Sequence, residues 1–181
     1  MGLHRGAGVT SMSVSIANYL VAFLKKRVAV CECNGSRDFI KAKDKLVGMD
    51  WHGDNTLSFS YGGCDYYPKG AVNEMDINAE NYHIVIKDFG TDGVIKDDFL
   101  RCDHKMIVSS LYPWMSKKLE TFYDKADSYA GSDTWLYVLA GSHEQIKAER
   151  KKHSIYAVVR PYIENPLVID SGLVDFFEAL F

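Results

Sequence analysis

The residues best suited to chemistry lie at the start of the chain, in a glycine-rich segment that runs into a helix-like stretch. Gly2, Gly6 and Gly8 shape this loop, and Thr10 and Ser11 follow it directly. Glycines let backbone amides turn inward around an anion, and the N-terminus of the following helix adds a partial positive charge. The segment predicts a phosphate-binding loop; the alternative is a glycine turn that precedes a helix and binds no ligand.

The loop departs from the usual phosphate-loop pattern at the position that carries positive charge. That pattern reads Gly-x-x-x-x-Gly-Lys-Ser/Thr. In this chain Gly8-Val9-Thr10 stands in place of the final Gly-Lys-Thr, and Leu3 occupies the position of the first glycine. Because valine carries no charge, a phosphate bound here depends on backbone amides and on a cation such as Arg5, which lies earlier in the same loop.

Helices and strands are expected to alternate along the chain and to hold this loop. Thr10 and Ser11 are expected to cap a first helix, since apolar residues recur at helical spacing from Val14 to Leu24. The later alternation predicts an α/β fold with a mostly parallel sheet flanked by helices, in one domain over residues 1–181. The expected strands cover residues 27–32, 56–67 (one strand, or a hairpin around Gly62-Gly63), 82–86, 105–109, 135–140 and 155–159, and the later helices cover residues 37–47, 114–126, 142–152 and 172–181.

Bulk composition limits the function. The chain is 47% apolar and 25% charged with a net charge of −3, which is ordinary for a soluble globular protein and lacks the basic excess of nucleic-acid-binding proteins. No apolar stretch approaches the roughly 20 residues that cross a bilayer. The 4 cysteines do not make a disulfide framework. We therefore expect a cytoplasmic protein with no membrane insertion and no nucleic-acid partner.

The loop and the strand after the first helix resemble motifs of the ParA/MinD superfamily of P-loop ATPases. The deviant Walker A loop of that family reads Lys-Gly-Gly-Val-Gly-Lys-Thr-Thr and is similar to residues 4–11, and its following helix is similar to residues 16–20. The second motif of the family is a strand that ends in Asp-x-Asp. Residues 28–34 resemble it, with Glu32 and Asn34 in the acidic positions.

Two later segments extend the resemblance in the expected order. Residues 84–90 are similar to the Walker B strand, with Asp88 as its aspartate, and residues 158–162 look like the strand end near the base pocket. The likeness spans about residues 2–165. It implies a P-loop NTPase fold of the MinD/ParA type with a truncated first strand, because only Met1-Gly2-Leu3 precede the loop. We expect either a natural start upstream of Met1 or a sheet that lacks most of a central strand.

The resemblance implies a site for ATP or ADP and for Mg²⁺. Thr10 would ligate the metal, with Asp88 behind it through water, and Glu32 would orient a water molecule. Glu32 and Asp88 are therefore the expected catalytic residues. The residues expected to bind nucleotide are His4, Arg5, Gly6, Ala7, Gly8, Val9, Thr10 and Ser11.

Two departures from the family weaken the expected catalysis. Val9 replaces the lysine that neutralises the β- and γ-phosphates, and His4 replaces the signature lysine that reaches the nucleotide of a dimer partner. Phosphoryl transfer depends on positioning and on neutralising developing charge, so these losses should reduce hydrolysis much more than folding. The expected protein binds nucleotide weakly or is a pseudo-ATPase.

Loops of the form Gly-x-x-x-Gly-x-Gly-x-Thr are typical of the CpaE/TadZ branch, and this loop fits that form. The resemblance implies a dimeric localisation or scaffold protein, with a protein partner from a localisation or secretion machinery such as pilus assembly. The alternative is an active ParA/MinD-type ATPase that serves partitioning or cell-division positioning. A third hypothesis is a structural relic that binds no nucleotide.

Two other features are open to a second interpretation. Cys31 and Cys33 could form a metal or redox pair, but without a further Cys or His pair they are expected to be core thiols. The basic stretch 147–152 is expected to be a solvated helix face, with a DNA-binding patch of the ParA kind as the alternative. The last helix lacks Lys and Arg, unlike the basic membrane tail of MinD.

Overall fold

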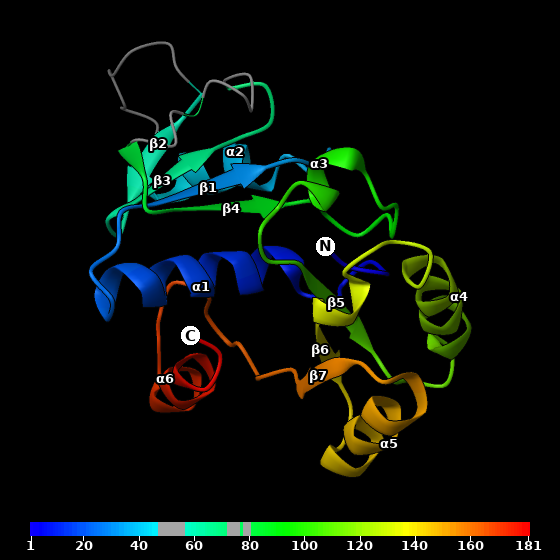
Figure 1. Ribbon diagram of the computed structural model, residues 1–181. Coiled ribbons are helices and arrows are strands. Elements are labelled where there is room, and N and C mark those ends of the chain that lie inside the picture. Colours follow the sequence, from blue (N-terminus) through cyan, green and yellow to red (C-terminus); the bar gives the residue numbers. More distant parts are fainter. Residues whose placement is uncertain (47–56, 72–76, 78–80) are drawn as a thin grey trace. The chain divides into compact units, whose positions relative to one another are not determined.

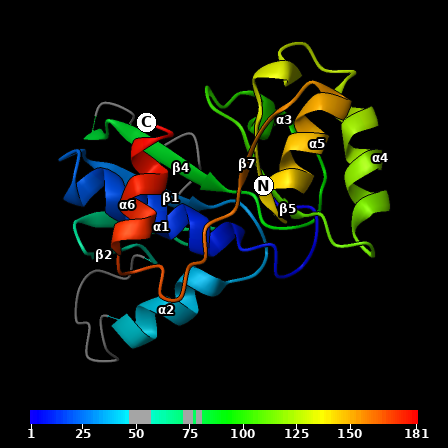
Figure 2. The ribbon, with the colours of Figure 1, turned by 90° about the horizontal axis from the view of Figure 1, so that it is seen from below.

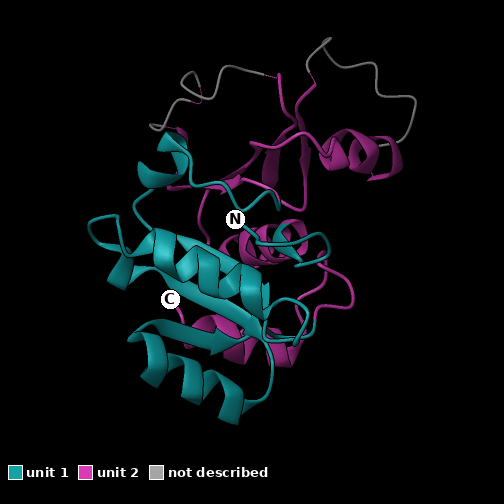
Figure 3. Ribbon diagram, turned by 90° about the vertical axis from the view of Figure 1, so that its right-hand side faces the viewer, with its two compact units in different colours: residues 1–9, 91–162 teal, residues 10–90, 163–181 magenta. Residues whose placement is uncertain are grey.

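The computed structural model describes residues 1–46, 57–71, 77 and 81–181. Val47 and Thr56, at the ends of two predicted elements, lie outside these residues. The chain divides into two compact units, each built from separate stretches of sequence (Figure 3). Unit 1 contains residues 1–9 and 91–162, and unit 2 contains residues 10–90 and 163–181. The prediction of one domain over residues 1–181 stays a prediction.

Unit 2 is built on a four-stranded sheet with the order β2-β3-β1-β4. Its centre is β1, whose five apolar or acidic residues are all buried because parallel strands pair on both sides. The outer β2 runs antiparallel to β3, so the hairpin around Gly62-Gly63 is confirmed. The strands are β1 (Val28–Glu32), β2 (Phe59–Tyr61), β3 (Cys64–Tyr67) and β4 (Ile84–Asp88).

Helix α1 lies between this sheet and helix α6 in unit 2 (Figures 1 and 2). The rings of Tyr19 on α1 and Phe177 on α6 have centroids 5.1 Å apart. Asn18 Nδ2 also donates to the carbonyl of Pro166, in the segment before α6, at 3.0 Å. The C-terminal helix therefore covers the apolar face of α1 that the sheet leaves open. The helices are α1 (Val9–Ala22), α2 (Asp38–Leu46) and α6 (Ser171–Glu178).

The turn between β2 and β3 depends on glycine at Gly63. Its φ of +81° lies in the left-handed region, and a Cβ there would approach Val21 Cγ1 on α1 to 2.9 Å. Gly70 has a similar φ of +85°, but nothing lies within 4 Å of the place that a Cβ would take there. We expect Gly63→Ala to lower the free energy of unfolding by about 1–3 kcal/mol and Gly70→Ala by about 1 kcal/mol. Urea unfolding of both variants measures the difference, and equal losses would show that the contact with Val21 costs nothing.

Unit 1 contains a second sheet, of three parallel strands in the order β5-β6-β7. Aromatic side chains from its helices pack on this sheet around Trp135, which is 2% exposed. The ring centroids of Phe99 and Trp135 are 5.4 Å apart, and those of Tyr123 and Tyr137 are 5.3 Å apart. The strands are β5 (Met106–Ser110), β6 (Leu136–Ala140) and β7 (Tyr156–Val159), and the helices are α3 (Asp97–Leu100), α4 (Ser116–Ala126), α5 (His143–His153) and the 3-10 helix η2 (Ser132–Thr134).

The first three residues of the chain pair with β5 in unit 1. Gly2 and Val108 form an isolated parallel bridge. Leu3 N donates to the carbonyl of Val108 at 3.2 Å, and Val108 N donates to the carbonyl of Met1 at 2.8 Å. Three residues are therefore enough to place the start of the loop beside a buried strand.

The predicted fold class is confirmed, with strands parallel except for β2 and helices between them. Most predicted bounds differ from the structure by one to three residues, and some details of the prediction were wrong. Helix α1 begins at Val9, so Thr10 and Ser11 lie in its first turn and do not cap it. It ends at Ala22, and Leu24 is 39% exposed beyond it. The fourth strand begins at Ile84 rather than Tyr82. No helix among the described residues is long and apolar enough to span a membrane.

Candidate functional site

The glycine loop lies entirely in unit 1. Gly6 and Gly8 have φ angles of +78° and +90°, a conformation that L side chains rarely adopt. The amide of Ala7 donates to the carbonyl of His4 at 3.1 Å and closes a turn within the loop. Nothing lies within 4 Å of the position of a Cβ on Gly6. The backbone therefore has the tight, side-chain-free turns that an anion-binding loop needs.

Val9 points into the core of unit 1. It is 5% exposed and packs with Ala7 and Val108, with Met106 at the edge of the same cluster. A Cβ on Gly2 would lie 2.5 Å from Val9 Cγ2, so the valine methyls fill the space beside the first residues of the chain. The position at which a phosphate loop carries lysine is thus occupied by a buried apolar side chain.

His4 is held at the carboxyl end of β5. Its Nε2 lies 3.1 Å from Ser110 Oγ, and its Nδ1 lies 3.0 Å from the carbonyl of Arg5. Both ring nitrogens are therefore engaged within unit 1. The side chain of Arg5 is exposed. Of the two basic residues predicted in the loop, only Arg5 projects into solvent.

Arg160 is a third basic residue at the loop, and it was not among the predicted site residues. Its Nη1 donates to the carbonyl of Ala7 at 2.5 Å, across 153 positions of sequence. The sequence pattern placed Arg160 at a strand end like that near the base pocket of the ParA/MinD superfamily. No spacing rule linked this residue to the loop, because the contact depends on how the sheet of unit 1 is ordered.

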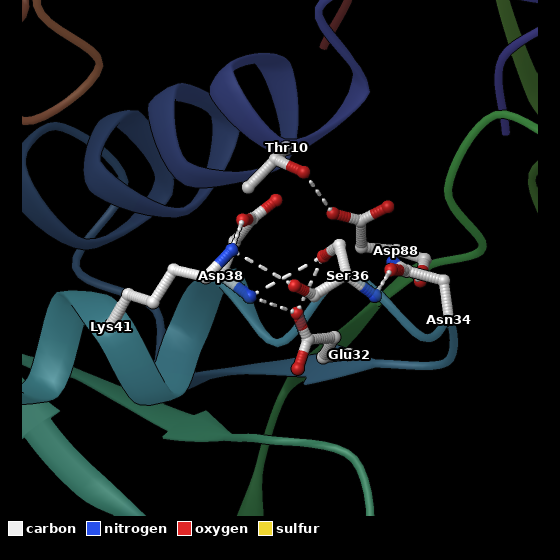
Figure 4. Close-up of polar contacts among 7 residues, drawn as sticks. All are labelled: Thr10, Glu32, Asn34, Ser36, Asp38, Lys41 and Asp88. Carbon is white, nitrogen blue, oxygen red and sulfur yellow. Dashed lines mark hydrogen bonds and ion pairs between the residues drawn. The ribbon is translucent and has the colours of Figure 1, made fainter. Parts of the chain in front are cut away.

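Thr10 and Asp88 form a close oxygen pair in unit 2 (Figure 4). Thr10 Oγ1 donates to Asp88 Oδ2 at 2.6 Å, and the amide of Gly90 donates to Asp88 Oδ1 at 2.8 Å. Asp88 is only 1% exposed. A threonine hydroxyl and a carboxylate are hard oxygen donors of the kind that Mg²⁺ prefers. The hydroxyl of Thr10, in the first turn of α1, thus makes a contact across 78 positions of sequence.

Glu32 is a buried carboxylate that stabilises the start of α2. It is 2% exposed. Its Oε1 accepts hydrogen bonds from Ser36 Oγ at 2.9 Å and from the amide of Asp38, the first residue of α2, at 2.7 Å (Figure 4). Its Oε2 accepts from the amide of Lys69 at 3.4 Å. The first amides of a helix have no partner within the helix, so Glu32 satisfies one of them.

A set of polar contacts ties these two carboxylates to the same turn of unit 2. Glu32 and Asp88 are paired in register on the neighbouring strands β1 and β4. Asn34 Nδ2 donates to the carbonyl of Asp88 at 3.0 Å, and Asn34 Oδ1 accepts from the amide of Ser36 at 2.9 Å. A Cβ on Gly90 would lie 2.8 Å from Asn34 Cβ, so this close approach requires glycine. The two carboxylates thus end neighbouring strands, and each is held by its own hydrogen-bond donors.

Lys41 forms an ion pair with Asp38, the first residue of α2, at 3.0 Å. Burial raises the pKa of Asp38, but hydrogen bonds from Lys41 and Ser36 outweigh it, so this pKa lies below its ordinary value. Ser11, also predicted to bind nucleotide, is half-buried in the first turn of α1.

Thr10 and Asp88 supply part of what a Mg²⁺ site needs. Thr10 and Asp88 fit Mg²⁺ by donor type, and they are two ligands where Mg²⁺ takes six. In the described part of the chain no three His, Cys, Asp or Glu side chains come together as a metal site. A bound Mg²⁺ would therefore take its other ligands from water and from phosphate oxygens. Cys31 and Cys33 are buried in unit 2, as expected for core thiols.

Comparisons with known proteins show the fold. The structure is similar to the crystal structure of a ParA family ATPase from Chlorobium tepidum TLS, with a TM-score of 0.64 and 16% sequence identity. The match covers 99% of this chain and 90% of that one. No family model matches the sequence, and no curated protein matches it. This chain therefore has the α/β fold of a ParA family ATPase.

Proposed function

We propose that this protein binds ATP or ADP with Mg²⁺ and hydrolyses ATP weakly or not at all. One observation carries the proposal: the Thr10–Asp88 pair is formed at 2.6 Å, while the lysine position of the loop holds the buried Val9. The oxygen donors for a metal are retained, and the lysine that a phosphate loop carries is lost. The ParA-like fold supports a nucleotide as the ligand.

Weak hydrolysis follows from the charge that the loop lacks. The transferred phosphoryl group spreads negative charge over its oxygens in the transition state, and catalysis requires that this charge be neutralised. Val9 contributes none, and the two ring nitrogens of His4 are engaged by Ser110 and by the backbone. When bound, Mg²⁺ would neutralise part of the phosphate charge, and Thr10 and Asp88 would hold it.

The wider role that we propose is that of a localisation or scaffold protein of the cytoplasm. The loop form given by Gly2, Gly6, Gly8 and Thr10 favours the CpaE/TadZ branch, whose members position pilus-assembly machinery. On this proposal the protein acts as a homodimer and binds a protein of a localisation or secretion machinery. Bound nucleotide would then regulate assembly rather than supply energy.

The second candidate is an active ParA/MinD-type ATPase. One observation favours it: Asp88 retains both the hydroxyl of Thr10 and the backbone contact that a Walker B aspartate needs to stay in place. Arg5, exposed in the loop, would supply the missing charge. Asp88→Ala should then abolish a measurable hydrolysis, whereas the first candidate has little hydrolysis to lose.

Calorimetric titration with ATP and ADP, in the presence and absence of Mg²⁺, tests nucleotide binding. We expect micromolar affinity that falls at least tenfold when Mg²⁺ is removed, because phosphate charge is then left to the loop alone. Asp88→Asn keeps the shape of the side chain and should remove most of the Mg²⁺ dependence while preserving Mg²⁺-free binding. If no binding is found at millimolar nucleotide, both candidate functions are rejected. The hypothesis of a structural relic that binds no nucleotide then remains.

A further inference from the structure

The guanidinium of Arg160 lies against the glycine loop of unit 1. Its Nη1 donates to the carbonyl of Ala7, and a Cβ built on Gly8 would lie 3.5 Å from the same nitrogen. The loop thus meets a cation at its second left-handed glycine. This contact joins residues that are far apart in the sequence but belong to one compact unit.

The backbone of Arg160 is fixed by the sheet. The residue directly follows β7, and its amide donates to the carbonyl of Leu139 on β6 at 2.8 Å, continuing the parallel ladder. Pro161 comes next and restricts the preceding residue to extended backbone. The side chain therefore starts from a rigid position at the carboxyl end of a strand, where ligands of α/β sheets bind.

The positive charge of Arg160 has no counter-charge in the described part of the chain. None of the ion pairs there involves it, and its side-chain hydrogen bond goes to the neutral carbonyl of Ala7. A guanidinium carries five N–H donors in a planar fork that matches phosphate oxygens in pairs. Val9 gives the loop no charge. Arg160, although distant in sequence, places a positive charge beside the loop.

We propose that Arg160 binds the phosphates of the nucleotide and supplies part of the positive charge that is lost where Val9 replaces lysine, which aids binding more than hydrolysis. This inference rests on the proposed function, since it names a residue of the same loop. Its ligand class is a di- or triphosphate, because one guanidinium can pair two oxygens while the loop amides hold the rest. The contribution of Arg160 should therefore grow with the number of phosphates.

Calorimetry of the full chain with adenosine, AMP, ADP and ATP, with Mg²⁺ present, tests the inference. We expect Arg160→Gln to weaken the binding of ADP and ATP about tenfold or more and to leave the affinity for adenosine unchanged. Arg150→Gln is the matched control, since Arg150 Nε also donates to a backbone carbonyl of unit 1, that of Ala157. This control should leave all four affinities within twofold. Thermal unfolding without ligand checks that both variants fold.

Inorganic tripolyphosphate separates this inference from the proposed function. If the wild type binds ATP and Arg160→Gln binds it equally or more tightly, the inference is overturned and nucleotide binding stands. If the wild type binds tripolyphosphate through Arg160 but binds no ATP, the anion role holds and the proposed function fails. If the wild type binds neither ATP nor tripolyphosphate, both the proposed function and the inference about Arg160 are overturned. Should Arg160→Gln fail to fold, Arg160→Lys replaces it. We then expect the affinity for ATP to fall about threefold and the affinity for adenosine to stay the same. An unchanged ATP affinity would reject the contact in which the guanidinium pairs two phosphate oxygens.

Discussion

Replacing Glu32 by alanine is expected to lower the free energy of unfolding by about 2–4 kcal/mol. The substitution leaves the amide of Asp38, the hydroxyl of Ser36 and the amide of Lys69 without their shared acceptor. Glu32 is 2% exposed, so water cannot easily replace the carboxylate. Urea unfolding followed by far-ultraviolet circular dichroism measures the loss.

Two control variants separate a structural role of Glu32 from a catalytic one. Glu32→Gln keeps one acceptor oxygen for the Ser36 hydroxyl and the Asp38 amide, so it should lower the free energy of unfolding by about half as much. Glu178→Ala removes an exposed glutamate of the same unit and should change stability by less than about 0.5 kcal/mol. If Glu32→Ala unfolds like the wild type and alters only nucleotide turnover, Glu32 is a catalytic group and its contacts with α2 are dispensable.

Introducing lysine at Val9 is expected to have opposite effects on the free protein and on the nucleotide complex. Without nucleotide, the ammonium enters the buried cluster of Ala7, Val108 and Met106, which should cost about 2–4 kcal/mol of stability. With Mg²⁺ and ATP, the same charge can pair with phosphate. Binding should tighten about tenfold relative to a neutral side chain of similar length, and hydrolysis should rise.

Val9→Met supplies that neutral comparison. It adds a long apolar chain to the same site and should cost about 1–2 kcal/mol with no gain in nucleotide affinity. The informative quantity is the shift in melting temperature on adding nucleotide, because a ligand stabilises only the state that binds it. Equal shifts for Val9→Lys and Val9→Met would mean that phosphate does not approach residue 9.

Regular elements could be predicted from the sequence because their signals are local. Residues 28–32 and 136–140 are short apolar runs, and both are buried parallel strands with neighbours on each side. The capping box of α5, with Ser142 and Gln145, gives that helix a clear start one residue from the predicted one. Helix α3 was missed since its four residues are too few for a helical period.

The site could be predicted only in part, because its contacts connect distant parts of the chain. The acidic residues were implied by the resemblance to ParA/MinD motifs, and Asp88 does lie where a strand stops, beside Thr10. Helical spacing alone favoured a cap for Thr10, and only the resemblance placed Asp88, 78 residues away, behind it. The inward direction of Val9 and the contact of Arg160 with Ala7 depend on the packing of unit 1, which no spacing rule describes.

The division of the chain into units has a consequence for genetic dissection. The polypeptide passes from one unit to the other three times, after Val9, after Gly90 and after Tyr162. No single uninterrupted stretch of the gene encodes either unit alone, so one continuous deletion that removes all of either unit also removes residues of the other. A nonsense codon at position 163 would leave unit 1 complete and strip α6 from unit 2. Separating the roles of the two units therefore calls for point substitutions rather than for truncations.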